Sequence, residues 1–241
     1  MAPDRAAVAQ LTADFIEPFV STAMPAALGI ATGATMEEPL AEVVRRHRRG
    51  AFSLASLQVY LLDEYLGLEP GGRDTFRHTV ERRLVCQTDL PPAAVHSPDP
   101  HAADLGAECD RYEREVRDAR IGLQLLGMGT NGHIAFNEPG SALTSTTRVV
   151  ELSPQTRADN ARFFPQGTAP PATAMTQGIA TILAAQELLL VACGESKACA
   201  LARAVIGPVS ELVPASALQL HPKVTVIVDP GAASNLAERP N

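Results

Sequence analysis

The stretch with the clearest chemical potential is LGMGTNGHIAFNEPGSAL, from Leu126 to Leu143. Gly127, Gly129 and Gly132 have the spacing G-x-G-x-x-G, which binds the pyrophosphate of a dinucleotide when it joins a strand to a helix. The same stretch runs directly into His133, a residue that exchanges protons near neutral pH. Two hypotheses follow, a dinucleotide-binding turn and a loop that delivers catalytic side chains.

The residues after Gly132 argue against dinucleotide binding. An apolar stretch before the motif and Glu151, about 20 residues beyond it, do fit that hypothesis. However, a dinucleotide turn opens directly into a helix, whose N-terminus holds the pyrophosphate. Here Pro139 and Gly140 interrupt the chain seven residues after Gly132, in a sequence typical of turns.

A catalytic loop explains the same residues better. Glycines let the backbone turn tightly beside a ligand. Glu138, five residues after His133, can return through the turn and bind the second ring nitrogen of the imidazole, which would fix its tautomer and stabilise its charged form. The alternative is a loop histidine that is hydrogen-bonded for structural reasons only.

Other chemically capable residues also follow apolar stretches. Asp63 lies about where the strand predicted in ASLQVYLLDEY ends, and partial desolvation there would raise its basicity; the alternative is a capping or surface-turn acid. Thr32–Thr35 (T-G-A-T) precede a predicted helix and offer backbone N–H groups and hydroxyls to an anion. The alternative for Thr35 is a plain N-cap.

Two cations stand out for their positions. Lys197 is one of only two lysines among 20 basic residues, and it falls in the first turn of a predicted helix. A positive charge there is unfavourable to the helix dipole, so a nearby anion would explain it. Arg162 lies in a segment rich in Pro, Gly and Thr, and it can close over a ligand; the alternative is an ordinary exposed arginine.

The elements that must position these residues alternate between strands and helices. Such alternation favours an α/β fold with a mostly parallel sheet covered on both faces, and ligands of such sheets bind beyond the carboxyl ends of the strands. We therefore expect one domain over residues 1–241, one shared site, and a mobile lid around residues 154–175. The predicted helices cover residues 5–22, 37–50, 74–85, 102–120 and 195–207, and the predicted strands cover 26–32, 55–65, 121–129, 146–153, 186–194 and 223–230.

Composition narrows the partners. The net charge of -7 and the pI near 5.4 argue against nucleic acid or an anionic membrane as partner. The N-terminus lacks a basic start followed by an apolar core, and no apolar run reaches about 18 residues, so we expect neither a signal peptide nor a membrane span. The four cysteines show no C-x-x-C spacing, which favours free thiols, a cytoplasmic location and no metal site.

The strings GHIAFNEPGSAL, LDEYLGL and ALQLHPK, in this order relative to RFF and GESK, resemble those of the glucosamine-6-phosphate deaminase family. That family is related to the 6-phosphogluconolactonases, and the resemblance covers nearly the whole chain. It implies a three-layer α/β/α sandwich with a modified Rossmann topology. It also implies conversion of D-glucosamine 6-phosphate and water to D-fructose 6-phosphate and ammonia, an aldose–ketose isomerisation with deamination that needs no metal and no redox cofactor.

The resemblance implies a role for each candidate residue. Asp63 matches the base that moves a proton from C2 to C1, His133 the acid–base group that opens the sugar ring, and Glu138 its carboxylate partner. Asn131 is a departure, because many members carry Asp there, although others resemble this chain in using Asn. We therefore expect His133 to be less strongly favoured as imidazolium than in a site with Asp. The phosphate-binding residues implied are Thr32, Gly33, Ala34, Thr35, Arg162 and Lys197.

Several questions stay open at this level. Some members are hexamers activated by N-acetylglucosamine 6-phosphate; Ser141 and Arg148 match their effector site, but Val150 replaces a lysine, so we expect no such activation. The substrate partner is a small sugar phosphate, and the chain is a monomer or a homo-oligomer. The rival functions are a lactonase, an enzyme for another sugar phosphate such as galactosamine 6-phosphate, and a non-catalytic sugar-phosphate sensor.

Overall fold

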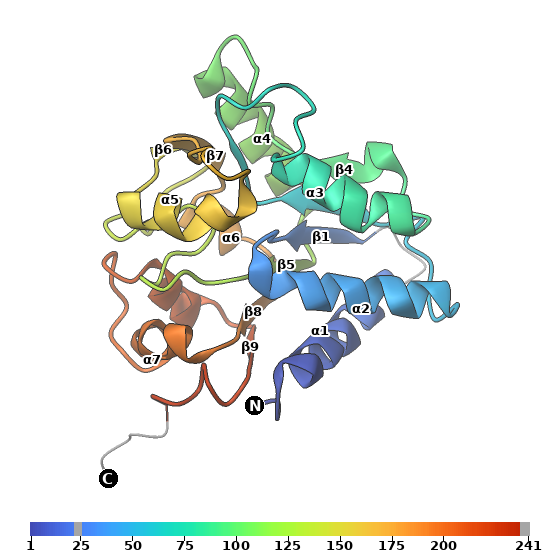
Figure 1. Cartoon of the computed structure of the whole chain (residues 1–241), viewed down its shortest axis with the longest axis vertical. Helices are drawn as coiled ribbons and strands as arrows, with labels where there is room; N and C mark the ends of the chain where they lie inside the picture. The colour runs from blue at the N-terminus through green and yellow to red at the C-terminus, as the bar shows by residue number, and fades with distance from the viewer. Residues whose placement is uncertain (22–25, 237–241) are drawn as a thin grey trace.

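The computed structural model describes residues 1–21 and 26–236, which form a six-stranded sheet whose paired strands all run parallel (Figure 1). The strand order is β4-β2-β1-β5-β8-β9. The sheet thus grows from β1 in one direction through β2 and β4, and in the other through β5, β8 and β9. Their bounds are β1 (Ala27–Ile30), β2 (Gln58–Leu61), β4 (Val95–His96), β5 (Leu123–Leu126), β8 (Leu188–Ala192) and β9 (Val224–Val228).

One face of this sheet is covered by α1 (Arg5–Val20), α2 (Glu37–Arg48) and α3 (Phe76–Arg83). Apolar side chains of these helices pack with the strand residues that point to the same face, such as Ile30 and Leu125. Two of the helices begin where the sequence supplies a cap. The side chains of Asp4 before α1 and Thr75 before α3 each accept a hydrogen bond from the backbone N–H three residues further on.

The other face is covered by α4 (Leu105–Ala119), α6 (Ile179–Ile182), α7 (Ala198–Val205) and the 3-10 helix η6 (Pro214–Leu220). Tyr112, Ile182, Leu201 and Leu218 from these elements pack on strand residues such as Leu190. Because the central strands are buried on both faces, they are almost wholly apolar, with Gln124 of β5 as an exception. The predicted three-layer α/β/α fold with a mostly parallel sheet is confirmed.

A second, three-stranded sheet has the order β3-β7-β6 and is antiparallel. It consists of β3 (Asp63–Tyr65), β7 (Thr173–Thr176) and β6 (Arg148–Glu151). The single strand expected over residues 55–65 is therefore wrong. The chain leaves the main sheet after Leu61, and Asp63 pairs instead with Thr176, so that β3 turns away from the edge of the main sheet.

Short elements account for the other differences from the predicted ones. The structure adds α6, β4, β7 and several 3-10 helices, and the segment expected as a lid contains α5 (Pro154–Asn160) followed by η4 (Ala161–Phe163). Elements of two to four residues carry too few positions for a periodic pattern. The predicted end of the first helix reaches residue 22, which lies outside the described residues.

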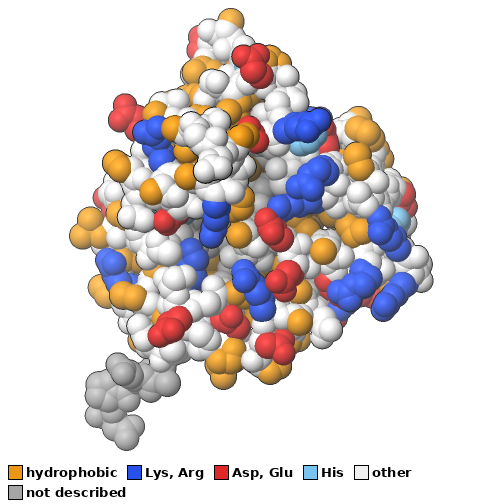
Figure 2. Space-filling view, in the orientation of Figure 1, with side chains coloured by type: hydrophobic (Ala, Val, Ile, Leu, Met, Phe, Trp, Pro, Cys, Tyr) orange, Lys and Arg blue, Asp and Glu red, His pale blue; other side chains and the backbone are white. Residues whose placement is uncertain are grey.

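Figure 2 shows basic side chains gathered on one edge of the visible face, over the C-terminal ends of α2 and α3. The last turn of α2 carries Arg45, Arg46 and Arg48, and that of α3 carries Arg82. Cations are favoured at these negative helix ends. Arg83, from the same turn of α3, donates a hydrogen bond to Glu37 at the start of α2 (2.7 Å). In the described part of the chain, no helix combines the length and apolarity needed to cross a membrane.

Candidate active site

The carboxyl edge of the main sheet carries most of the residues that the sequence singled out; Arg162 lies instead in η4 (Ala161–Phe163), between β6 and β7 of the second sheet. Since the strands are parallel, the segments that follow β1, β2, β5 and β8 emerge at the same edge. Thr32–Thr35 follow β1, Asp63 follows β2, the glycine-rich loop follows β5, and Lys197 follows β8. The chain order reverses between β1 and β5, and such a switch point is where open α/β sheets bind ligands.

The glycine-rich loop folds tightly under the His133 ring. Gly129 N donates to the carbonyl of His133 at 2.9 Å, and Gly132 has a φ of 90°, a conformation that glycine adopts without strain. A Cβ on Gly129 would lie 2.2–2.5 Å from three ring atoms of His133, so only glycine leaves room for the imidazole. No helix follows Gly132 within this loop, which agrees with the argument against a dinucleotide turn.

Two polar side chains surround Nδ1 of His133 without a short hydrogen bond. Glu138 Oε2 lies 3.8 Å from this nitrogen and Thr156 Oγ1 of α5 lies 3.5 Å from it. Glu138 instead accepts hydrogen bonds from Asn131 Nδ2 (2.8 Å) and from Ser153 Oγ (3.1 Å). The expected direct bond between Glu138 and the imidazole is therefore not formed at this separation, and the carboxylate acts on the ring through its charge.

Asn131 organises this arrangement from both of its ends. Its Oδ1 accepts the backbone N–H of His133 at 3.1 Å while its Nδ2 holds Glu138. Burial lowers the pKa of His133, Glu138 and Asp159 oppose that change, and Lys197 adds to it. The imidazole is thus favoured in its neutral form, which can accept a proton.

Asp63 is a buried acid with a high proton affinity. Its side chain is only 8% exposed. Burial first, and the neighbouring charge of Glu64 second, raise its pKa to about 8. Asp63 pairs with Thr176, whose hydroxyl accepts a hydrogen bond from the backbone of Phe136 at 3.1 Å. This chain of contacts ties β3 to the loop that carries His133, three residues before Phe136.

The segment after β1 presents the start of a helix to the same edge. Gly33 is the N-cap of the 3-10 helix η1 (Ala34–Met36), which leads directly into α2. Neither η1 nor α2 has a side-chain cap, so Thr35 is not the N-cap that a structural role would require. The first N–H groups of this helical segment and the hydroxyls of Thr32 and Thr35 are thus suited to an anion.

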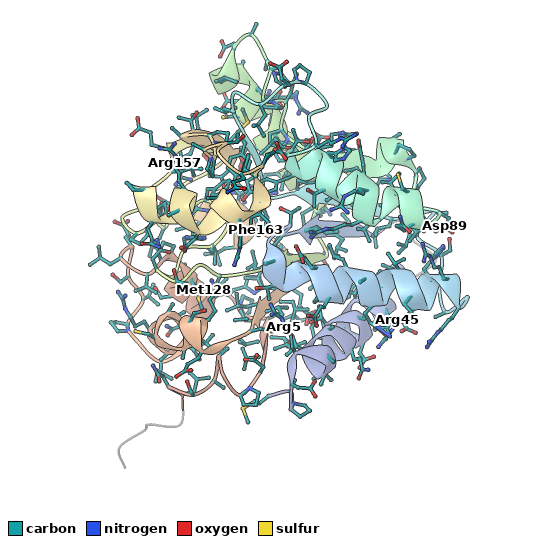
Figure 3. All side chains as sticks on the ribbon, in the orientation of Figure 1. Arg5, Arg45, Asp89, Met128, Arg157 and Phe163 are labelled. Carbon is teal, nitrogen blue, oxygen red and sulfur yellow. The ribbon has the colours of Figure 1, made fainter. Side chains whose placement is uncertain are left out.

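The two candidate cations influence each other. Burial lowers the pKa of Lys197, with a further lowering from Arg162 and an opposing effect from Asp159. Lys197 lies in η5 (Glu195–Lys197), before α7, whereas Arg162 is exposed in η4 and stacks on Phe163 at 4.9 Å. Figure 3 labels Phe163 in this turn and Met128 on the glycine-rich loop. Lys197 and Arg162 are thus close enough to act on each other, and the start of η1 lies at the same edge of the sheet as Lys197.

Sequence reasoning missed three residues of this site. Thr156 approaches the imidazole, and Asp159 of α5 accepts a hydrogen bond from Thr130 of the glycine-rich loop at 3.2 Å. Glu64 is fully buried beside Asp63. Only Glu64 had a signal in the sequence, because an acid in the middle of an apolar stretch needs a partner.

Comparison with known proteins agrees with the geometry. Residues 3–227 match the profile of the family described as glucosamine-6-phosphate isomerases/6-phosphogluconolactonase. A glucosamine-6-phosphate deaminase of Arthrobacter sp. is 44% identical over 97% of this chain and 90% of its own length, and one of Corynebacterium aurimucosum is 47% identical over 96% and 91%.

Solved structures extend the comparison. One described as a monomeric glucosamine-6-phosphate deaminase superposes with a TM-score of 0.93 at 39% identity, over 97% of this chain and 98% of that one. A 6-phosphogluconolactonase from Trypanosoma brucei, at 18% identity and a TM-score of 0.75 over 98% and 97%, shares the fold. The chain belongs to the glucosamine-6-phosphate isomerase/6-phosphogluconolactonase family.

Proposed function

We propose that the chain is a glucosamine-6-phosphate deaminase, which converts D-glucosamine 6-phosphate and water to D-fructose 6-phosphate and ammonia. The observation that carries the proposal is the buried, strongly basic Asp63 tied to the His133 loop at a sheet edge lined with anion-binding groups. Relatives that are 44% and 47% identical over nearly the whole chain bear this name. The function belongs to amino-sugar metabolism.

Phosphate binding comes first in the proposed reaction. The backbone N–H groups of Gly33, Ala34 and Thr35, at the start of η1, point one helix end at the anion, and the hydroxyls of Thr32 and Thr35 add donors. Lys197 supplies a half-buried ammonium group; burial lowers its pKa, and a bound anion would favour its charged form. Arg162 then closes over the phosphate from η4, and we propose that residues 154–175 move with it as a lid.

His133 opens the sugar ring. Its neutral imidazole takes the proton from O1 and delivers it to O5, which breaks the C1–O5 bond of the ring and leaves the open-chain amino aldehyde. During this transfer the ring is briefly imidazolium, and the charge of Glu138 at 3.8 Å stabilises it. Asn131 keeps both groups in place through its two hydrogen bonds.

Asp63 then carries out the isomerisation. Its carboxylate removes the proton from C2 while O1 of the aldehyde gains one, which gives an enolamine between C1 and C2. Asp63 then returns its proton to C1 while the amino nitrogen loses one. The product is an imine at C2, and water adds to it to release ammonia and D-fructose 6-phosphate. A carboxylate whose pKa is raised to about 8 is a much stronger base than an exposed aspartate, and this suits abstraction of a proton from carbon.

Turnover of defined substrates tests the proposal. The protein is mixed with glucosamine 6-phosphate, and ammonia and fructose 6-phosphate are measured together; we expect them in equal amounts. Galactosamine 6-phosphate and 6-phosphogluconolactone serve as competing substrates. Faster hydrolysis of the lactone, or phosphate binding without release of ammonia from either amino sugar, would overturn the proposal in favour of a lactonase or a sensor.

Assembly and regulation are part of the same proposal. We infer a monomer, because a structure described as monomeric is 39% identical over 97% of the chain; light scattering on the purified protein tests this. We also infer no activation by N-acetylglucosamine 6-phosphate. Arg148 already donates to Asn137 Oδ1 and Ser141 Oγ, at 2.9 and 3.2 Å, and Val150 adds no charge. A sigmoidal rate curve that the effector makes hyperbolic would contradict this.

A further inference from the structure

Glu64 has a setting that the proposed reaction does not explain. It is 1% exposed and stands directly beside Asp63 in β3. Its Oε1 accepts the backbone N–H groups of Tyr65 (2.9 Å) and Phe76 (3.0 Å), and its Oε2 accepts that of Arg77 (2.9 Å). Burying a carboxylate costs stability because the charge loses its hydration, so the position of Glu64 beside the proposed base needs an explanation.

These contacts anchor Glu64 on the first turn of α3. Phe76 and Arg77 are the first two residues of the helix, and the N-cap Thr75 accepts the N–H of His78, the third. The glutamate thus satisfies two of the N–H groups that a helix start leaves free. Because β3 is only three residues long, this contact fixes where the strand begins and hence where Asp63 points.

We propose that Glu64 is a positioning residue for Asp63: held by α3, it fixes the short strand that presents Asp63 and keeps a permanent negative charge next to it. The inference rests on the proposed function, since it assigns Asp63 the role of base. It separates two neighbouring acids by their surroundings, one that keeps its charge and one that exchanges a proton.

The hydrogen bonds determine which of the two acids keeps its charge and which one takes up a proton. Burial raises the pKa of Glu64, whereas the three N–H groups that it accepts, two of them at the positive end of a helix, oppose that change and stabilise the carboxylate. Among the described residues, none donates a hydrogen bond to the carboxylate of Asp63. When the pair binds one proton, Asp63 therefore receives it, and the charge of Glu64 makes Asp63 the stronger base.

The other charged or titratable groups around the pair are few. Arg77 of α3 acts on Glu64, but its guanidinium is directed to Glu81, the carbonyl of Val95 and Ser97. Tyr65 of β3 and Tyr112 of α4 feel the charge of Asp63, and burial raises the pKa of both phenols, so they stay neutral. The partner residues Met175 and Thr176 in β7 carry no charge. Glu64 is thus the nearest fixed charge that tunes Asp63.

The pH dependence of kcat/KM tests the proposal through Glu64→Gln. The amide keeps the volume and can still accept from Tyr65 and Phe76, so the fold should survive. Loss of the charge should move the acid limb of the profile downward by about one pH unit. The matched control is Glu81→Gln, the same substitution on the outer part of α3, for which we expect no shift. An acid limb of Glu64→Gln that stays in place while the rate falls would overturn the proposal.

Glu64→Asp provides the second arm, and it decides the question if Glu64→Gln does not fold. It keeps the charge but shortens the reach to α3, so we expect kcat to fall at least about tenfold with the acid limb unchanged. Wild-type kcat would overturn the positioning role. If the wild-type protein does not release ammonia, or if Asp63→Asn stays active, the proposed function itself is wrong. If wild type is active and Asp63→Asn is inactive, but neither Glu64 variant changes kcat or the acid limb of the pH profile, only the inference about Glu64 is wrong.

Discussion

Gly129→Ala should disable the imidazole while leaving the fold intact. The added Cβ would lie 2.2 Å from Cε1 of His133, whereas ordinary contact begins near 3.4 Å, so the ring must move by about 1 Å. The φ of Gly129 lies outside the left-handed region, and the clash involves a side chain that can rotate, so the backbone is not strained. A displacement of this size costs on the order of 100-fold in rate.

The assay is steady-state release of ammonia from glucosamine 6-phosphate, together with a thermal melt. We expect kcat to fall by about two orders of magnitude and Tm to change by no more than a few degrees. Gly127→Ala is the matched control from the same loop, because a Cβ there meets no atom within 4 Å. If kcat of Gly129→Ala stays within threefold of the wild-type value, the prediction is wrong, because His133 would then work equally well from a displaced position.

Three further substitutions have expected outcomes. Asp63→Asn should stabilise the fold at neutral pH, because the pKa of Asp63 is about 8 in the folded state and about 4 in the unfolded state. Between these pH values the folded state keeps a proton that the unfolded state releases, so stability falls as pH rises through this range, and Asn removes that loss. The substitution should therefore raise Tm by several degrees at pH 7.5 but hardly at pH 4; equal Tm changes at both would contradict this. Glu113→Gln should lower the free energy of unfolding by about 2 kcal/mol at pH 7. Glu113 accepts hydrogen bonds from Thr147, Thr181 and Arg117, which hold its pKa below the usual value against the effect of burial. This contribution is present above pH ~4 and lost as pH falls further, so urea unfolding of both proteins at pH 7 and at pH 3 should show a difference only at pH 7. Lys197→Gln should weaken inhibition by inorganic phosphate about 10- to 100-fold, and an unchanged inhibition constant would remove Lys197 from the phosphate site.

The main sheet and its long helices could be predicted because each has a clear pattern. The apolar run LLLVA of β8 marks a strand buried on both faces, and β5 (LQLL) is interrupted only by Gln124. The break at Leu62 could not be predicted, because apolar residues continue across it. What separates β2 from β3 is pairing with β7, more than 100 residues away, and no local pattern encodes that choice.

For the site, the sequence predicted which residues share an edge, but not their contacts. Parallel strands bring Asp63, His133 and Lys197 to the same edge whatever the side chains do. The contact of Glu138 with Asn131 and Ser153, rather than directly with the imidazole, depends on how the loop closes against α5. The hydrogen bonds of Glu64 to Phe76 and Arg77 depend in the same way on where α3 begins.

The central claim is that Asp63 moves the proton between C2 and C1 while separate groups hold the phosphate. It is tested most directly by Asp63→Asn, with ammonia and fructose 6-phosphate measured as products and inorganic phosphate binding measured by calorimetry. Both products should disappear together, with kcat reduced by at least about 1,000-fold, while phosphate binds as in wild type. Turnover within tenfold of wild type, or loss of phosphate binding along with activity, would contradict it.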